Sequence, residues 1–289
     1  MIIETEKLSI NPNAKIELLS IGPNQLPVLQ VDDFYIDPEY IRELALSLYF
    51  SPYRYHPGDV AGIDLDPNPL IEFVHSHFPN LYDLSLEQFK ATLNTVWHFA
   101  LVRKTRDDLS DSHCRPHVDP LCLSGIIYLN LPEDCQGGTG FYMHKETQVS
   151  EIISTNVTNK DVCGLPHVLK KLDELKVFAR YHALKDKYNW KVYNNMADTV
   201  LATPKRKQDH IRESNEDWEL VNKTEMRFNR MIIFPSYLLH SLYTKDEWFG
   251  DKDEHKRLTQ NLFFFWPKEN QMPDANNQFT KFQAIAKYY

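Results

Sequence analysis

The sequence predicts a mainly β fold with flanking helices. Several segments combine β-branched and aromatic residues between turn residues, and this pattern favours strands over helices. Aromatic residues make up 12% of the chain, which suits a sheet-based core or an aromatic-lined pocket. The expected strands are 28–31, 94–102, 124–130, 137–144, 218–221, 228–235 and 257–266.

Helical patterns lie before and between these strands. Asp37-Pro38-Glu39 is typical of a helix start, because Asp caps, Pro occupies the first helical position and an acid follows in the first turn. A second helix is expected over 66–78 and a third over 166–188, whereas 51–62 reads as a Pro-stiffened loop. The apolar stripe expected on the first helix is Ile41, Leu44, Ala45 and Leu48.

No internal repeat or low-complexity linker divides the sequence, so residues 1–289 are expected to form one domain. Its last segment is amphipathic and would pack as a final helix or form a homodimer contact. The expected parts are 1–92 (strands and supporting helices), 93–144 with 218–266 (the β core), 145–217 (a helical insertion, with a lid as one hypothesis) and 267–289 (the tail).

Composition excludes several classes of function. A net charge of −8 argues against a broad nucleic-acid-binding surface. No apolar run approaches the roughly 20 residues that a membrane span needs, and the first residues lack a secretory pattern. The cysteines form no C-x-x-C pair, which indicates reduced thiols in a cytoplasmic protein. A structural zinc site at His113-Cys114 lacks a fourth ligand at suitable spacing. The cysteines are Cys114, Cys122, Cys135 and Cys163.

His117 and Asp119 are the first candidate metal ligands. In an extended segment, residues two apart point to the same side, roughly 7 Å from one another along the chain. An imidazole and a carboxylate so placed could fill two of the three protein positions around a non-haem iron. The motif alone identifies nothing, because about one H-x-D is expected by chance in a chain with this composition.

The order of features after this motif is more informative. A Gly-Gly turn, an insertion and an apolar strand precede His240, and Arg257 opens the last expected strand. Two imidazoles and a carboxylate leave coordination positions open for a chelating keto acid and dioxygen. The far carboxylate of a keto acid would suit the two-point geometry of an arginine. Thr259 lies on the same strand face as Arg257 and could donate to that carboxylate.

At these positions the chain resembles the iron(II)/2-oxoglutarate-dependent oxygenases. The nearest group is the prolyl-4-hydroxylase-like bacterial proteins, often left as a domain of unknown function (DUF6445-like). The similarity covers roughly residues 95–266. It is carried by His117-Val-Asp119, Ser124-Gly-Ile-Ile-Tyr-Leu-Asn130, Gly137-Gly-Thr139, Asn229-Arg-Met-Ile-Ile-Phe-Pro-Ser236, His240-Ser241 and Arg257-Leu-Thr259.

The resemblance implies a double-stranded β-helix, or jelly roll, with N-terminal helices and a helical insertion. It implies that His117, Asp119 and His240 bind Fe(II). It further implies that Arg257, with Thr259, binds the distal carboxylate of 2-oxoglutarate, and it makes Tyr128 a further cosubstrate-binding candidate. Turnover would consume 2-oxoglutarate and O2, release succinate and CO2, and hydroxylate a C–H bond.

Two departures from the family pattern stand out. The Gly137-Gly-Thr139 turn is one residue longer than usual, which could shift the register of its strand. The interval between His240 and Arg257 is also longer, and the charged segment 245–256 would absorb the difference. Asp119 is retained where related halogenases carry a small residue, and this favours hydroxylation over halogenation.

Three alternatives stay open at this point. The chain could be a cupin-like metalloenzyme without a keto acid, a non-catalytic jelly-roll binding protein, or an oxygenase that desaturates or cyclises its substrate. Fold alone does not decide among them. The loops 51–62, 103–116 and 145–217 are expected to shape the substrate pocket, and their composition fits a small molecule, an amino acid or a peptide side chain.

Overall fold

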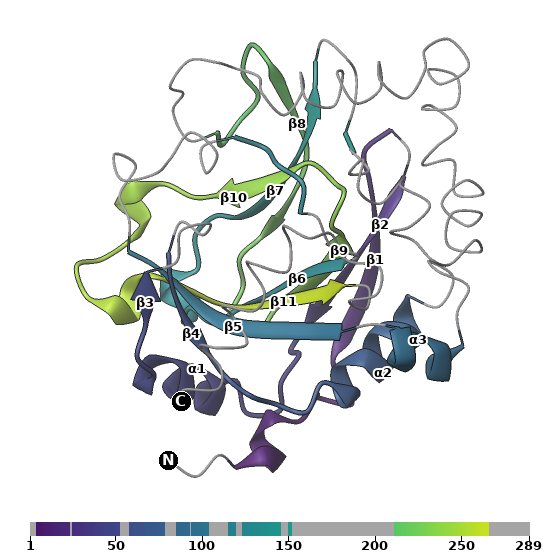
Figure 1. Cartoon of the computed structure of the whole chain (residues 1–289). Coiled ribbons are helices and arrows are strands. Elements are labelled where there is room, and N and C mark those ends of the chain that lie inside the picture. Colours follow the sequence, from purple (N-terminus) through teal and green to yellow (C-terminus); the bar gives the residue numbers. More distant parts are fainter. Residues whose placement is uncertain are drawn as a thin grey trace.

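The computed structural model describes residues 4–23, 25–52, 58–78, 85–92, 94–103, 115–119, 123–145, 150–151 and 211–265. Several expectations fall outside these residues: the helix over 166–188 with most of the 145–217 insertion, the 267–289 tail, and most of the 103–116 loop. Three cysteines also lie outside them, whereas Cys135 is a free thiol. Within the described residues the protein is mainly β, with two antiparallel sheets and α-helices beside the larger one (Figure 1).

The larger sheet has eight strands in the order β1-β2-β9-β6-β11-β5-β4-β3. Its centre is built from apolar, β-branched and aromatic segments that are far apart in the chain. The last strand of the described residues, β11, pairs with both β5 and β6 and therefore lies in the middle of the sheet. The strands are β1 (Lys15–Ile21), β2 (Leu26–Asp32), β3 (Ser51–Pro52), β4 (Asp59–Gly62), β5 (Asn94–Val102), β6 (Leu123–Tyr128), β9 (Met231–Pro235) and β11 (Arg257–Phe265).

The smaller sheet has three strands in the order β10-β7-β8. They are β7 (Gly138–His144), β8 (Trp218–Glu225) and β10 (His240–Tyr243). The β7–β8 register shifts between Phe141 and Tyr142, so this strand does carry an irregularity after the long Gly-Gly turn. The side chain of Phe141 packs edge-on against Phe234 of β9, with ring centroids 5.3 Å apart, and this contact joins the two sheets.

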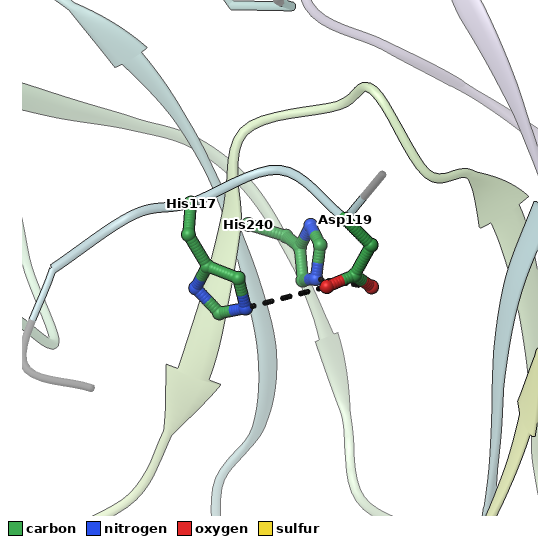
Figure 2. A group of neighbouring side chains, drawn as sticks. All are labelled: His117, Asp119 and His240. Atoms are coloured by element: carbon green, nitrogen blue, oxygen red, sulfur yellow. Dashed lines mark ion pairs between the residues drawn. The ribbon is translucent and has the colours of Figure 1, made fainter. Parts of the chain in front are cut away.

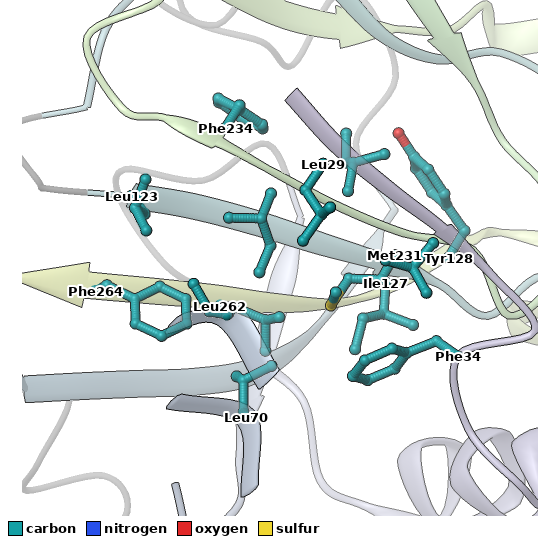
Figure 3. Packing of buried hydrophobic residues seen from close by; sticks show 14 of the residues in the cluster. Leu29, Phe34, Leu70, Leu123, Ile127, Tyr128, Met231, Phe234, Leu262 and Phe264 are labelled. Carbon is teal, nitrogen blue, oxygen red and sulfur yellow. The ribbon is translucent and has the colours of Figure 1, made fainter. Parts of the chain in front are cut away.

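The α-helices of the described residues lie on the side of the large sheet away from the small one (Figure 1): α1 (Pro38–Ser47), α2 (Asn68–His77) and α3 (Leu86–Thr92). The predicted start of α1 is confirmed, because the Asp37 side chain accepts a hydrogen bond from the Tyr40 N–H. Ile41 and Leu44 of α1 are buried in the core. Figure 3 shows this core from close by, with Leu70 of α2 near Leu262 of the sheet.

Successive side chains of β11 point to opposite faces of the large sheet, one covered by the helices and one facing the small sheet. Leu258, Leu262 and Phe264 belong to the hydrophobic core that the helices cover. Arg257 and Thr259 point the other way, toward the small sheet. Thr259 is the partner of Tyr128 on β6, whose hydroxyl is 2.8 Å from Thr139 of β7. The space between the two sheets is therefore lined by polar as well as apolar side chains.

The structure corrects parts of the sequence prediction. The segment 51–62 is not a loop throughout, because β3 and β4 lie within it and β4 pairs with β5. The strand predicted over 228–235 begins only at Met231, since Arg227–Arg230 form a turn in which Asn229 has a positive φ of 61°. The helix α3 was not predicted. No helix among the described residues is long and apolar enough to cross a membrane.

Candidate metal centre

The backbone around the predicted metal ligands is held by strand-like hydrogen bonds. His117 and His240, the first residue of β10, form an antiparallel bridge in which each N–H donates to the carbonyl of the other at 2.9 Å. The Asp119 N–H donates to the Ser236 carbonyl, also at 2.9 Å. The H-x-D segment is therefore attached to the chain that leads into β10 at two points, and its two ligands face the same side.

The three predicted ligands converge. Figure 2 shows the two imidazoles and the carboxylate directed toward one another. The His117 Nε2 is 3.9 Å from Asp119 Oδ1, and the His240 Nε2 is 3.5 Å from Asp119 Oδ2. One ligand atom from each residue lies within 4.8 Å of the others, so His117, Asp119 and His240 could hold a metal ion. The expectation that these residues meet is confirmed.

Contacts behind the ligands fix their orientation. The His240 Nδ1 lies 2.8 Å from the Leu238 carbonyl, which requires a proton on Nδ1 and directs Nε2 at the cluster. The Phe234 ring packs edge-on against the His240 ring, with centroids 4.8 Å apart. The two imidazole rings themselves are 4.5 Å apart. His240 therefore has both its tautomer and its ring plane set by the protein.

Asp119 is held as a carboxylate. Burial raises the pKa of Asp119, but the His240 and His117 rings and a hydrogen bond from Ser124 outweigh burial and hold the pKa below the usual aspartate range. The Ser124 hydroxyl donates to Asp119 Oδ2 at 2.7 Å and lies 3.0 Å from the Ser236 hydroxyl. In metal sites, hydrogen bonds of this kind from neighbouring residues orient the carboxylates that bind the metal.

The cluster opens on one side. The side-chain exposure falls from 44% for His117 to 22% for Asp119 and 8% for His240. His117 is therefore the ligand side chain most exposed to solvent, and His240 is the most buried.

Arg257 lies deeper between the sheets and is 4% exposed. Its guanidinium lies over the Tyr128 ring at 5.4 Å and donates one long hydrogen bond, 3.4 Å, to the Gly138 carbonyl. Burial lowers its pKa, but an arginine stays charged in proteins. Among the described residues no carboxylate lies within ion-pair distance of Arg257, and its Nε has no hydrogen-bond partner there. Such a buried charge is costly unless an anion neutralises it.

The other two cosubstrate candidates lie on the same face as Arg257. Tyr128 is buried beneath the guanidinium, and burial raises its pKa, so its hydroxyl is neutral. Thr259 is fully buried beside it. The Thr259 hydroxyl donates to Asn261 Oδ1 at 3.0 Å, so its proton points along β11 and away from Arg257.

Strand β6 connects the metal cluster with Arg257 along this face. Ser124 at one end of β6 supports Asp119, and Tyr128 four residues later contacts Arg257, so the ends lie roughly 13 Å apart along the strand. Sequence reasoning did not assign a role to Ser124, nor to Asn261. Alternation was the available signal, because both residues share a strand face with residues that were assigned.

The chain matches a protein family over the region that carries these residues. A family model described as a family of unknown function, DUF6445, matches residues 12–162 and 178–264. No curated protein matches the chain. Because the matched residues make up well over half of the sequence, the chain belongs to the DUF6445 family, whose function is unknown.

Proposed function

We propose that the two sheets form a double-stranded β-helix, or jelly roll. The pairing order supports this, because β5, β11, β6 and β9 are consecutive neighbours in the large sheet. The bridge between His117 and His240 adds the 115–119 segment to the β10 edge of the small sheet. The four central strands of the large sheet would then face four strands of the smaller layer, which is the arrangement of a jelly roll.

The cluster of His117, Asp119 and His240 would hold Fe(II) in this proposal. Two imidazole nitrogens and one carboxylate, with further positions open, are the ligand set of non-haem iron oxygenases. The donor chemistry fits, because His240 presents Nε2 and Asp119 is ionised. A structural zinc site would need a closed set of four ligands, and no fourth His, Cys, Asp or Glu joins the cluster among the described residues.

The burial of the Arg257 guanidinium is the observation that supports 2-oxoglutarate as the cosubstrate. A buried guanidinium without a carboxylate partner in the described part of the chain lies on the same inter-sheet face as the metal cluster. A dicarboxylic keto acid would use one end at the metal and place its other carboxylate against this charge. The Tyr128 ring would lie beneath that carboxylate, and the Thr259 hydroxyl would contact it.

The function that this arrangement supports best is an iron(II)- and 2-oxoglutarate-dependent oxygenase, which most simply hydroxylates a C–H bond. The bound iron and 2-oxoglutarate would supply the oxidising chemistry, with succinate and CO2 as products. The chain's own part is to hold three ligands on one side of the metal, neutralise the distal carboxylate with Arg257 and keep water out between the sheets.

The test is oxygen consumption and succinate formation from 2-oxoglutarate by the purified protein with added Fe(II). Activity should require His117, Asp119 and His240, and each alanine variant should lose it. His255→Ala is the matched control, because His255 is half exposed, pairs with Asp134 and lies outside the cluster. Unchanged turnover in His117→Ala or Asp119→Ala would reject the site.

The alternatives give different outcomes in the same assay. A cupin-like metalloenzyme without a keto acid would bind metal but would be indifferent to 2-oxoglutarate and to Arg257→Ala. A binding protein would consume no oxygen. An oxygenase that desaturates or cyclises its substrate would give the same oxygen consumption and succinate formation, and only its product would differ.

The substrate would approach past His117, since that ligand is the most exposed of the three. We propose a small molecule, an amino acid or a peptide side chain as the substrate. A substrate screen read out by succinate formation above the uncoupled background would identify it.

A further inference from the structure

Strand β1 forms one edge of the large sheet (Figure 1). It pairs with β2, and its other side has no strand partner within the described residues. Residues 15–18 are all exposed, although successive side chains of a strand point to opposite faces of its sheet. This half of β1 is therefore exposed on both faces, and its outer edge is available to another strand.

The position of Pro27 decides which backbone groups face that outer edge. Pro27 of β2 is the partner of Ser20 on β1, and a proline has no N–H to donate. Opposite residues of antiparallel strands alternate between hydrogen-bonded and non-hydrogen-bonded pairs, so the pair of Ser20 and Pro27 is of the second kind. By the same alternation, Ile16 and Leu18 direct their N–H and carbonyl groups away from β2, toward the outer edge.

The exposed side chains of β1 differ between its two faces. Ile16 and Leu18 share one face and are 43% and 59% exposed. Lys15 and Glu17 share the other face, so opposite charges lie two residues apart on it. Exposed apolar residues on an unpaired edge favour pairing with another strand, whereas charged residues on an edge restrict which strand can pair there.

We propose that β1 is the contact through which two copies of this chain pair edge to edge, antiparallel, across a two-fold axis. Ile16 lies on the axis and exchanges both backbone hydrogen bonds with Ile16 of the second copy. Lys15 lies opposite Glu17 of the second copy, and Glu17 lies opposite the second copy's Lys15. The axis therefore creates two ion pairs, and the inference is independent of the proposed function.

Charge selects this register among those that the outer edge allows. The hydrogen-bonded pairs must form between Ile16, Leu18 and Ser20, because these residues face the edge. An axis at Glu17 would place its carboxylate opposite the same carboxylate of the second copy, and like charges directly opposite are destabilising. An axis at Leu18 would place both charged side chains opposite aliphatic ones. Of the three registers, the axis at Ile16 pairs the opposite charges.

The contacts within one copy are compatible with these ion pairs. Lys15 Nζ lies 2.9 Å from Asp33 Oδ2, and Glu17 Oε2 accepts a hydrogen bond from Gln30 Nε2 at 3.2 Å. An ammonium group can donate to more than one acceptor, and a carboxylate can accept from more than one donor. The contacts between copies therefore add to those within each copy and need no side chain to give up a partner.

The first test is sedimentation velocity of the full chain over a range of protein concentrations. The wild type should form a reversible dimer. Lys15→Glu and Glu17→Lys should each weaken the dimer Kd about 10-fold or more, because the two-fold axis turns two opposite-charge pairs into like-charge pairs. A wild type that stays monomeric at its highest soluble concentration would mean that the edge has another occupant or none, and would overturn the proposal.

Mixing the two variants tests the register itself. The Lys15→Glu chain presents two carboxylates at these positions and the Glu17→Lys chain presents two ammonium groups. An equimolar mixture should therefore form heterodimers about as tightly as the wild type dimerises, and both changes in one chain should restore the homodimer. A dimer that either single variant leaves intact, or that the mixture fails to restore, would contradict pairing through β1 in this register.

Asp33→Asn is the matched control. Asp33 is the partner of Lys15 within one copy, and its φ of 58° suits asparagine as well as aspartate. This variant removes an exposed ion pair and leaves β1 unchanged, so the dimer Kd should stay within about twofold of the wild type. A loss equal to that of Lys15→Glu would mean that Lys15 acts within its own chain, and would contradict the ion pair between copies.

Discussion

His117 and His240 are hydrogen-bonded to each other through their backbones in both directions, at 2.9 Å. One residue belongs to a short segment after β5 and the other opens β10, so the bridge fixes the distance between two candidate metal ligands that are remote in the chain. The ligand positions therefore depend on formation of the β10 edge of the small sheet.

Ser124→Ala should weaken metal binding about 10- to 100-fold, because it removes the hydrogen bond that orients Asp119. The measurement is titration of the metal-free protein with Mn(II) or Co(II). Ser241→Ala is the control, since Ser241 adjoins His240 and is buried, but its hydroxyl has no hydrogen-bond partner among the described residues. Equal affinities of the Ser124→Ala variant and the wild type would show that Ser124 does not support the carboxylate.

Arg257→Met should leave the ligand-free protein as stable as the wild type, or more stable, because it removes a buried charge that lacks a carboxylate partner in the described region. The same change should weaken 2-oxoglutarate binding by at least about 100-fold. Thermal unfolding with and without the keto acid measures both effects.

The control for that variant is Arg42→Met. Arg42 is also buried, but it donates to the Leu129 and Glu254 carbonyls at 3.2 and 2.7 Å. Its replacement should destabilise the fold by roughly 1–3 kcal/mol. A comparable destabilisation by Arg257→Met would indicate that Arg257 serves the fold and would remove the main argument for a keto acid.

Gly138→Ala should destabilise the protein by roughly 3 kcal/mol or more. Gly138 has a φ of 149°, and an added Cβ would lie 2.0 Å from the Thr224 carbonyl oxygen of β8. The strain follows from the backbone of the Gly-Gly turn, where no flexible side chain can move aside. Chemical denaturation measures the change, and a variant as stable as the wild type would show that the turn can adopt another conformation.

His98 should make the stability depend on pH. Burial lowers its pKa to about 3 in the folded protein, against an ordinary value near 6.5, so the unfolded chain binds the extra proton first. The contribution of His98 to the free energy of unfolding is full above about pH 6.5. It is lost as the pH falls toward 3, at up to about 1.4 kcal/mol per pH unit. Denaturant midpoints across this range should fall less steeply in His98→Phe than in the wild type.

The sequence by itself determined the secondary structure in the places where local chemistry decides it. The Asp37-Pro38 start of α1 and the full length of β5 were predicted from capping and from β-branched and aromatic residues. The H-x-D motif predicted that His117 and Asp119 share a side, since that follows from residue spacing alone. These features depend on neighbours within a few residues.

Only the tertiary structure decided which distant residues meet. The pairing of β11 with both β5 and β6 brings Arg257 over Tyr128 and Asn261 next to His98, and no local pattern specifies that register. The bridge to His240 and the support of Asp119 by Ser124 likewise require strands from separate parts of the chain. Sheet partners are chosen by burial of complete faces, a property of the folded chain as a whole, and this is the physical reason that the site's composition could be predicted while its supporting contacts could not.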